Sequence, residues 1–195
     1  MKVVIVGAGQ QGHVITWNLA RNPAVSAIIL ADYDAARARL IADQVGDRTT
    51  TPLVVAASDT AAVARLAAAA KLVVNAVIPE YNMSVMRACL QAGASYLDMA
   101  SGQTQTKTID EAYLEQITLA EEFKSRGLVA LLNTGMDPGV TNTFAANGYE
   151  DLDRCFEIRL KDYAIFDSPV HVSYTHLRAH ETDLDLVCRL LPEKK

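Results

Sequence analysis

Short apolar runs alternate with longer mixed stretches along most of the chain, and glycine, proline or polar residues separate them. The short runs predict strands, and the stretches between them predict helices. The predicted strands span residues 2–6, 27–31, 52–56, 72–77, 96–98 and 128–132. The predicted helices span residues 13–22, 35–45, 61–70, 81–92 and 108–126. In the first of these helices, Val14, Trp17 and Leu19 supply the apolar positions.

The predicted strands are apolar throughout instead of alternating with polar residues. This pattern indicates strands that are buried on both faces, as in a parallel sheet covered by helices on each side. We therefore predict an α/β fold with a Rossmann-type, doubly wound parallel sheet over residues 1–150. Residues 151–171 are expected to begin a second, α+β domain.

Composition narrows the possible partners. The 195 residues are 50% hydrophobic and 21% charged, and the formal net charge is −5. This balance excludes a disordered chain, and the lack of a basic patch argues against nucleic acid as a partner. The three cysteines, Cys89, Cys155 and Cys188, form no metal-binding pair, so reduced thiols and no metal are expected. The sequence shows neither an export signal nor an apolar run long enough to span a membrane. We therefore predict a cytoplasmic protein without a membrane partner.

A glycine-rich turn follows the first predicted strand and matches G-x-G-x-x-G at Gly7, Gly9 and Gly12. In a dinucleotide site the first glycine permits a tight turn, the second lets the backbone approach a pyrophosphate, and the third allows close packing of the helix. The free N–H groups at the start of that helix attract phosphate. The predicted cofactor-binding residues of this turn are Gly7, Ala8, Gly9, Gln10, Gln11 and Gly12.

The second predicted strand ends at Asp32, twenty residues beyond the last glycine of the motif. A carboxylate at this place accepts hydrogen bonds from the ribose 2′-OH and repels a 2′-phosphate, which favours NAD over NADP. Arg37 and Arg39 follow one turn later and keep NADP possible.

Asn75 and Val77 come at the end of the fourth predicted strand, beside the expected place of the nicotinamide ribose. Asn75 either hydrogen-bonds there or merely ends the strand. His13 lies behind the phosphate turn and is interpreted as structural, and Cys89 is interpreted as a core residue.

Three passages of the sequence resemble the saccharopine dehydrogenase family. They are VIVGAG at 4–9, VVNAVIP at 73–79 continuing to YLD at 96–98, and GMDPGVTN at 135–142. The third passage is the most specific, and the resemblance covers roughly residues 1–167.

The resemblance implies NAD(P)-dependent oxidoreduction at the C–N bond of an amino-acid-derived secondary amine or imine. It implies that Asp137 lines the substrate-facing end of the cofactor cleft, although the residue alone is also compatible with a helix cap. A second domain would bind the small amino-acid substrate, and the full-length family form would be a homodimer. The family's saccharopine-forming branch often carries a cysteine followed by two glycines, which residues 156–163 lack, and this argues against saccharopine itself.

Residues 172–195 break the preceding pattern and read as the in-frame translation of a sequencing adapter. His176, His180 and Cys188 are therefore dropped as candidate ligands. On this interpretation the chain is a truncated fragment, which is expected to bind a dinucleotide poorly or moderately and to have no turnover. The alternative from another class is a stand-alone NAD-binding regulatory or sensor module, and a Rossmann reductase of the homoserine or semialdehyde type is a further one.

Overall fold

The computed structural model describes residues 1–46, 49–102, 104–136, 138–150 and 152. The chain divides into two compact units, Met1–Thr134 and Gly135–Lys195. Within the second unit, the described residues form one helix, α7 (Val140–Glu150). The predicted domain starting at 151 and the predicted adapter tail at 172–195 lie outside the described residues, apart from position 152.

The first unit is built on one six-stranded parallel sheet in the order β3-β2-β1-β4-β5-β6. This order is that of a doubly wound Rossmann sheet, so the predicted fold class is confirmed. The order in which successive strands are added reverses between β1 and β4, and doubly wound sheets bind ligands in a crevice at the carboxyl ends of the strands at such a point. The strands are β1 (Lys2–Val6), β2 (Ala27–Asp32), β3 (Thr50–Val54), β4 (Leu72–Asn75), β5 (Ser95–Asp98) and β6 (Ala130–Leu131).

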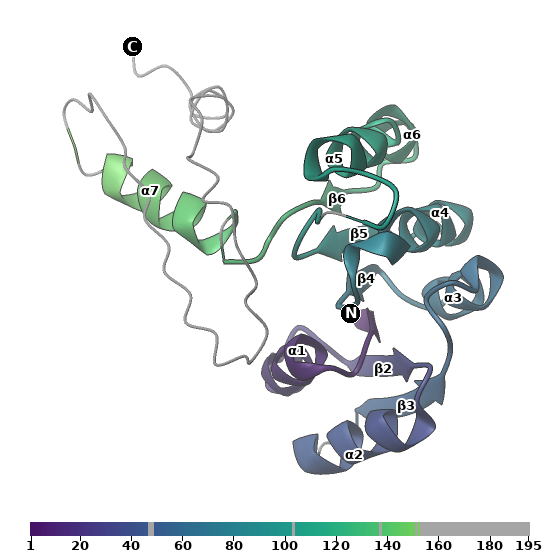
Figure 1. The fold of residues 1–195 in the computed structure, drawn as a ribbon. Coiled ribbons are helices and arrows are strands. Elements are labelled where there is room, and N and C mark those ends of the chain that lie inside the picture. Colours follow the sequence, from purple (N-terminus) through teal and green to yellow (C-terminus); the bar gives the residue numbers. More distant parts are fainter. Residues whose placement is uncertain (47–48, 103, 137, 151, 153–195) are drawn as a thin grey trace, which may run out of the picture. The chain divides into compact units, whose positions relative to one another are not determined.

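Helices cover both faces of the sheet (Figure 1). On one face Val3 and Ile5 of β1 pack with residues of α1 and α2, and on the other Val4 and Val6 pack with residues of α3, α4 and α6. These four side chains of β1 are at most 1% exposed, as the uninterrupted apolar run predicts. The helices are α1 (Gln10–Ala20), α2 (Ala35–Val45), α3 (Thr60–Ala67), the short 3-10 helix η1 (Pro79–Tyr81), α4 (Asn82–Ala92), α5 (Ile109–Ile117) and α6 (Ala120–Ser125).

The predicted apolar positions of the first helix are right for Leu19, which packs against the core, and wrong for the other two. Val14 and Trp17 are 58% and 42% exposed, whereas Gly12 and Thr16 are the buried residues of α1. The helix also begins three residues earlier than predicted, at Gln10, so it starts inside the glycine turn. A polar residue can face the sheet here because the Thr16 hydroxyl donates to the Gly12 carbonyl, 2.6 Å away, and so has a partner.

The single long helix predicted over 108–126 is wrong as well, because the structure has two helices there. Thr118 closes α5 by donating its hydroxyl to the Glu115 carbonyl at 2.6 Å, which satisfies a carbonyl at the helix end. The break lets Leu119 and Phe123 both reach the core, at 8% and 2% exposure.

The two edge strands depart from the prediction of burial on both faces. In β3, which the structure shifts two residues earlier, Leu53 and Val54 are exposed, and Pro52 pairs with Leu30 of β2. β6 retains only Ala130 and Leu131 of the predicted five-residue strand. An edge strand has only one neighbour, so its side chains are covered less completely than those of a central strand.

Candidate functional site

The turn between β1 and α1 is shaped by two glycines that have no room for a side chain. Gly7 has a φ of +107°, and a Cβ on it would lie 2.7 Å from the Ala76 carbonyl oxygen. A Cβ on Gly12 would lie 1.8 Å from the Gly7 carbonyl oxygen. Both residues must therefore be glycine for the turn and the helix to pack as they do.

Gly9 is different, because nothing in the described protein occupies the space beside it. A Cβ at this position would meet no atom within 4 Å, and its φ of −78° suits any residue. No side chain caps α1, so the first-turn N–H groups of Gln10, Gln11 and Gly12 lack intrahelical acceptors. The open space and the free donors adjoin each other, and together they fit a phosphate group.

The structure places Asp32 at the carboxyl end of β2, against the same turn. Its side chain is 5% exposed, and its two oxygens accept the backbone N–H groups of Ala8 at 2.7 Å and Asp34 at 2.8 Å. The carboxylate thus fastens the end of β2 to the glycine turn. Because a carboxylate offers about four acceptor positions, two remain for further donors.

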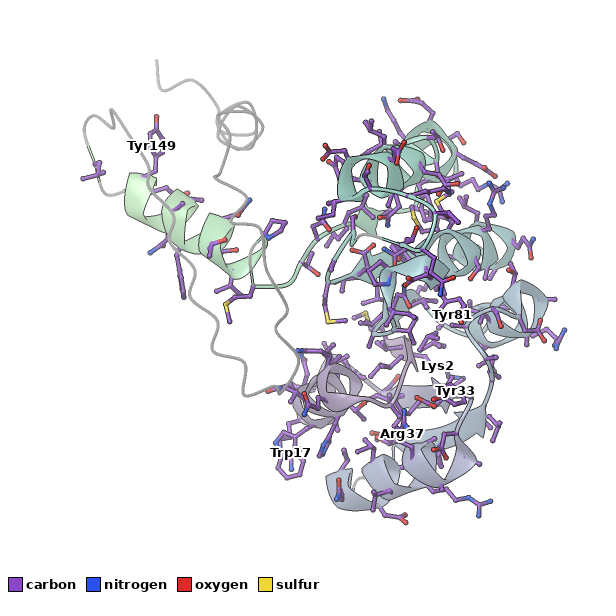
Figure 2. The ribbon with its side chains drawn as sticks, in the orientation of Figure 1. Lys2, Trp17, Tyr33, Arg37, Tyr81 and Tyr149 are labelled. Atoms are coloured by element: carbon purple, nitrogen blue, oxygen red, sulfur yellow. The ribbon has the colours of Figure 1, made fainter. Side chains whose placement is uncertain are left out.

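Tyr33 and Arg37 follow Asp32 and lie side by side, as Figure 2 shows. The guanidinium carbon of Arg37 is 5.7 Å from the centre of the Tyr33 ring, and its Nη2 is 3.7 Å from the Asp34 carboxylate. Both side chains are exposed, and so is Arg39. The polar surface beyond β2 therefore carries one aromatic ring and two guanidinium groups.

Asn75 lies inside the protein, with its side-chain amide turned toward α4 and β5. The residue is 1% exposed, and its Nδ2 donates to Asn82 Oδ1 at 2.8 Å and to Tyr96 Oη at 3.2 Å. Its Oδ1 is buried without a partner. Val77, two residues on, is half-buried, and a Cβ on Gly7 would lie 2.8 Å from its Cγ1.

Asp98 ends the YLD passage but was not predicted as a site residue, and the structure makes it the centre of a buried network. The residue is 1% exposed; Oδ2 accepts from Tyr96 Oη at 3.0 Å and Gln116 Nε2 at 2.7 Å, and Oδ1 accepts the Asn133 N–H at 2.7 Å. Burial raises the pKa of the Asp98 carboxyl, and these three hydrogen bonds offset part of that rise. Burial, with Asp98 nearby, also raises the pKa of Tyr96.

Three further residues were singled out in the sequence: Asp137, His13 and Cys89. Asp137 lies outside the described residues; nearby, Gly139 has a φ of +137° and α7 begins at Val140. His13 lies on α1, half-buried. Cys89 is fully buried in the core, as predicted, and burial raises the pKa of its thiol to about 12.

Over the described residues, no three His, Cys, Asp or Glu side chains gather as a metal site. Every helix in that part of the chain is too short or too polar to cross a bilayer.

The family model for the saccharopine dehydrogenase NADP binding domain matches residues 3–131. The chain is 35% identical over 147 residues to the carboxyaminopropylagmatine dehydrogenase of Synechocystis sp., covering 74% of this chain and 37% of that protein. It is 31% identical over 160 residues to the carboxynorspermidine synthase of Vibrio cholerae, covering 75% and 39%. The chain thus spans less than half the length of these relatives.

Among solved structures, the apo saccharopine dehydrogenase (L-Glu forming) of Saccharomyces cerevisiae aligns with a TM-score of 0.62 at 18% identity. The alignment covers 77% of this chain and 31% of the yeast one. At this identity the likeness establishes the fold.

Proposed function

Because the chain belongs to the saccharopine dehydrogenase family, we propose that it is the dinucleotide-binding part of an NAD(P)-dependent oxidoreductase. The reaction we propose is oxidation or reduction at the C–N bond of an amino-acid-derived secondary amine or imine. The names of the two relatives, a dehydrogenase and a synthase of carboxylated amines, support this substrate class. The observation that best supports dinucleotide binding is the open space at Gly9 beside the uncapped start of α1.

Each part of the turn has a proposed task. The N–H groups of Gln10, Gln11 and Gly12 hold the pyrophosphate, and the missing side chain of Gly9 lets the backbone approach it. The carboxylate of Asp32 keeps Ala8 in place and accepts the ribose 2′-OH with an acceptor position that the protein does not use. When bound, the nicotinamide supplies the hydride acceptor or donor.

The remaining predicted residues belong to the other half of the crevice. Val77 borders the nicotinamide ribose, and Asn75 holds the end of β4 at that place from within the protein. Asp137 faces the substrate, as its position in the GMDPG passage implies. The resemblance implies that a second domain binds most of the substrate, and this chain spans less than half the length of its relatives. We therefore propose that this chain binds the cofactor without turnover. An amine-dependent reduction of NAD(P)⁺ at full rate would contradict that proposal.

Trp17 offers a direct test of dinucleotide binding, because it is the chain's one tryptophan and lies on α1. Energy transfer from Trp17 to NADH is expected on titration, and it yields the Kd. Gly9→Ala should weaken NADH binding by about tenfold, because the new methyl group occupies the phosphate cradle.

Gly93→Ala serves as the matched control. Gly93 ends α4 at a φ of +73°, at the amino end of β5 and so away from the crevice. This variant should lose about 1 kcal/mol of stability and keep the Kd of the wild type. If NADH binds the wild type and Gly9→Ala with equal affinity, the turn is not the phosphate site. If it binds neither, the proposed function fails.

Between the two cofactors, we propose that NAD is preferred, because a buried carboxylate at Asp32 disfavours a 2′-phosphate nearby. The family model's description as NADP binding and the exposed guanidinium of Arg37 support the opposite choice. Titrations with NADH and NADPH decide between them. If NADPH binds more tightly and Arg37→Gln removes the difference, NADP is the cofactor.

A further inference from the structure

A network of polar side chains is buried at the carboxyl ends of β4 and β5, next to the crevice but away from its surface. Five of its members are 0–3% exposed: Asn75, Asn82, Tyr96, Asp98 and Gln116. Asp98 is the one charged member, and no ion pair among the described residues includes it. A buried charge with no counter-charge is costly, so the fold has to hold it by hydrogen bonds alone.

Those hydrogen bonds lead from Asp98 to the chain that leaves β6. Its Oδ1 accepts the Asn133 N–H, and its backbone carbonyl accepts both the N–H and the hydroxyl of Thr134, at 3.0 and 2.6 Å. Asn133 has a φ of +57°, a left-handed conformation that asparagine adopts more often than most other residues with a side chain. Its side-chain oxygen accepts the Ser101 N–H from the segment after β5. Asp98 therefore holds the exit of β6 at Asn133 and Thr134 by three hydrogen bonds.

A second path leads from Asp98 to the strand beside the glycine turn. The Tyr96 hydroxyl donates to Asp98 and accepts from Asn75. Asn75 pairs with Asp98 across β4 and β5 and with Val6 across β4 and β1. Asn75 thus connects the carboxylate to the residues directly before Gly7.

A third path fixes the start of α4. Gln116 of α5 donates to Asp98 through Nε2, and its Oε1 accepts from Asn82 at 3.3 Å and from the Ser101 hydroxyl at 2.5 Å. Asn82 in turn donates to the Ala100 carbonyl at 2.9 Å. One carboxylate thereby joins the segments that follow β4, β5 and β6.

In a doubly wound sheet the half containing β1 to β3 holds the adenosine end of a dinucleotide, and the half containing β4 to β6 holds the other nucleotide. We propose that Asp98 is a positioning residue for the nicotinamide half of the cofactor. It acts through Asn133, Thr134 and the Tyr96–Asn75 path, and it does not touch the cofactor. This inference rests on the proposed function.

The test compares a whole dinucleotide with its adenosine half. Isothermal titration calorimetry on the full chain gives the Kd of NADH and of ADP, which lacks the nicotinamide and its ribose. Asp98→Asn places an NH₂ group or a weaker acceptor against three donors, so the three segments lose their common anchor. We expect NADH binding to weaken by about tenfold and ADP binding to change by less than about twofold.

A merely structural role for Asp98 would weaken both ligands together, and this result would overturn the proposal. Unchanged binding of both ligands would overturn it as well. Failure of the wild type to bind either ligand would instead refute the proposed function. Gly9→Ala is the matched reference, because a filled phosphate cradle weakens NADH and ADP alike.

Tyr96→Phe keeps the test decisive if Asp98→Asn does not fold. It removes one hydroxyl, while Asn75 keeps its bond to Asn82 and Asp98 keeps those to Gln116 and Asn133. The same selective loss for NADH is expected with a smaller size, about threefold. Equal effects on the two ligands would refute the path through Tyr96.

Discussion

The glycine turn and the Asp98 network are the two parts of the crevice edge, and they are built in opposite ways. The turn depends on absent side chains: Gly7 and Gly12 have no space for a Cβ, and Gly9 leaves space open. The network depends on side chains that reach one another from β4, β5, α4 and α5. The turn is thus specified within six residues, whereas the network requires the whole half of the sheet to be folded.

This contrast separates two kinds of vulnerability. A change in the turn acts by steric overlap on one rigid backbone segment. A change in the network acts by leaving buried donors or acceptors without partners, and its effect spreads to every segment that the network joins. Three substitution experiments test this distinction.

Gly12→Ala should have the largest effect on stability. Its Cβ would lie 1.8 Å from the Gly7 carbonyl oxygen, so β1 and α1 must move apart, at a cost of about 3 kcal/mol. Urea unfolding followed by circular dichroism measures the loss. Gly9→Ala, in the same turn but with open space, should change stability by less than about 1 kcal/mol. Equal losses in the two variants would mean that sterics do not distinguish the two glycines.

Gln116→Leu should have the next largest effect, about 2 kcal/mol, although leucine fills a similar volume. The variant removes a donor to Asp98 and an acceptor for Asn82 and Ser101, all inside the protein. The same unfolding measurement applies. Gln105→Leu, at an exposed position, is the control and should stay within about 0.5 kcal/mol of the wild type. A loss no greater than that of the control would show that the network contributes little stability.

The pH dependence of stability should reveal the charge of Asp98, with the smallest effect of the three. Since burial raises the pKa of this carboxyl in the folded protein, the folded state binds its proton more tightly than the unfolded state does. The contribution of Asp98 to the free energy of unfolding is therefore most favourable below its unfolded pKa of about 4. This contribution declines as pH rises through the folded pKa, by about 1.4 kcal/mol per pH unit between the two pKa values.

Asp98→Asn removes this titration. The free energy of unfolding of the wild type should therefore fall relative to that of the variant as pH rises from the unfolded to the folded pKa of Asp98. A difference that stays constant with pH, or that shifts toward the wild type, would contradict the raised pKa.

The sequence allowed the fold and the turn to be predicted because both depend on local patterns. Apolar runs separated by glycine, proline or polar residues predicted all six strands, and the spacing of Gly7, Gly9 and Gly12 predicted the turn. Their proposed contacts with a cofactor stay predictions, as does the role of Asp137.

The rest could not be predicted, because it depends on contacts between residues far apart in the chain. Asp98 ends a short strand, as many other carboxylates do, and nothing near it signals Gln116 or Asn133, 18 and 35 residues further along. The exposed face of α1 was also missed, because Val14 and Trp17 are apolar while the buried Thr16 is polar and bonded to its own helix. Hydrophobicity alone cannot identify a buried residue whose polarity is satisfied locally.

The proline in β3 has a consequence for the behaviour of this protein in concentrated solution. An edge strand that exposes Leu53 and Val54 offers an incoming chain a template for intermolecular sheet growth. Pro52 has no N–H, and a proline within a strand is tolerated where its nitrogen faces away from the neighbouring strand. A molecule that approaches this edge therefore finds no N–H donor at the middle residue of the strand, so this partly apolar edge of the sheet is also a poor seed for aggregation.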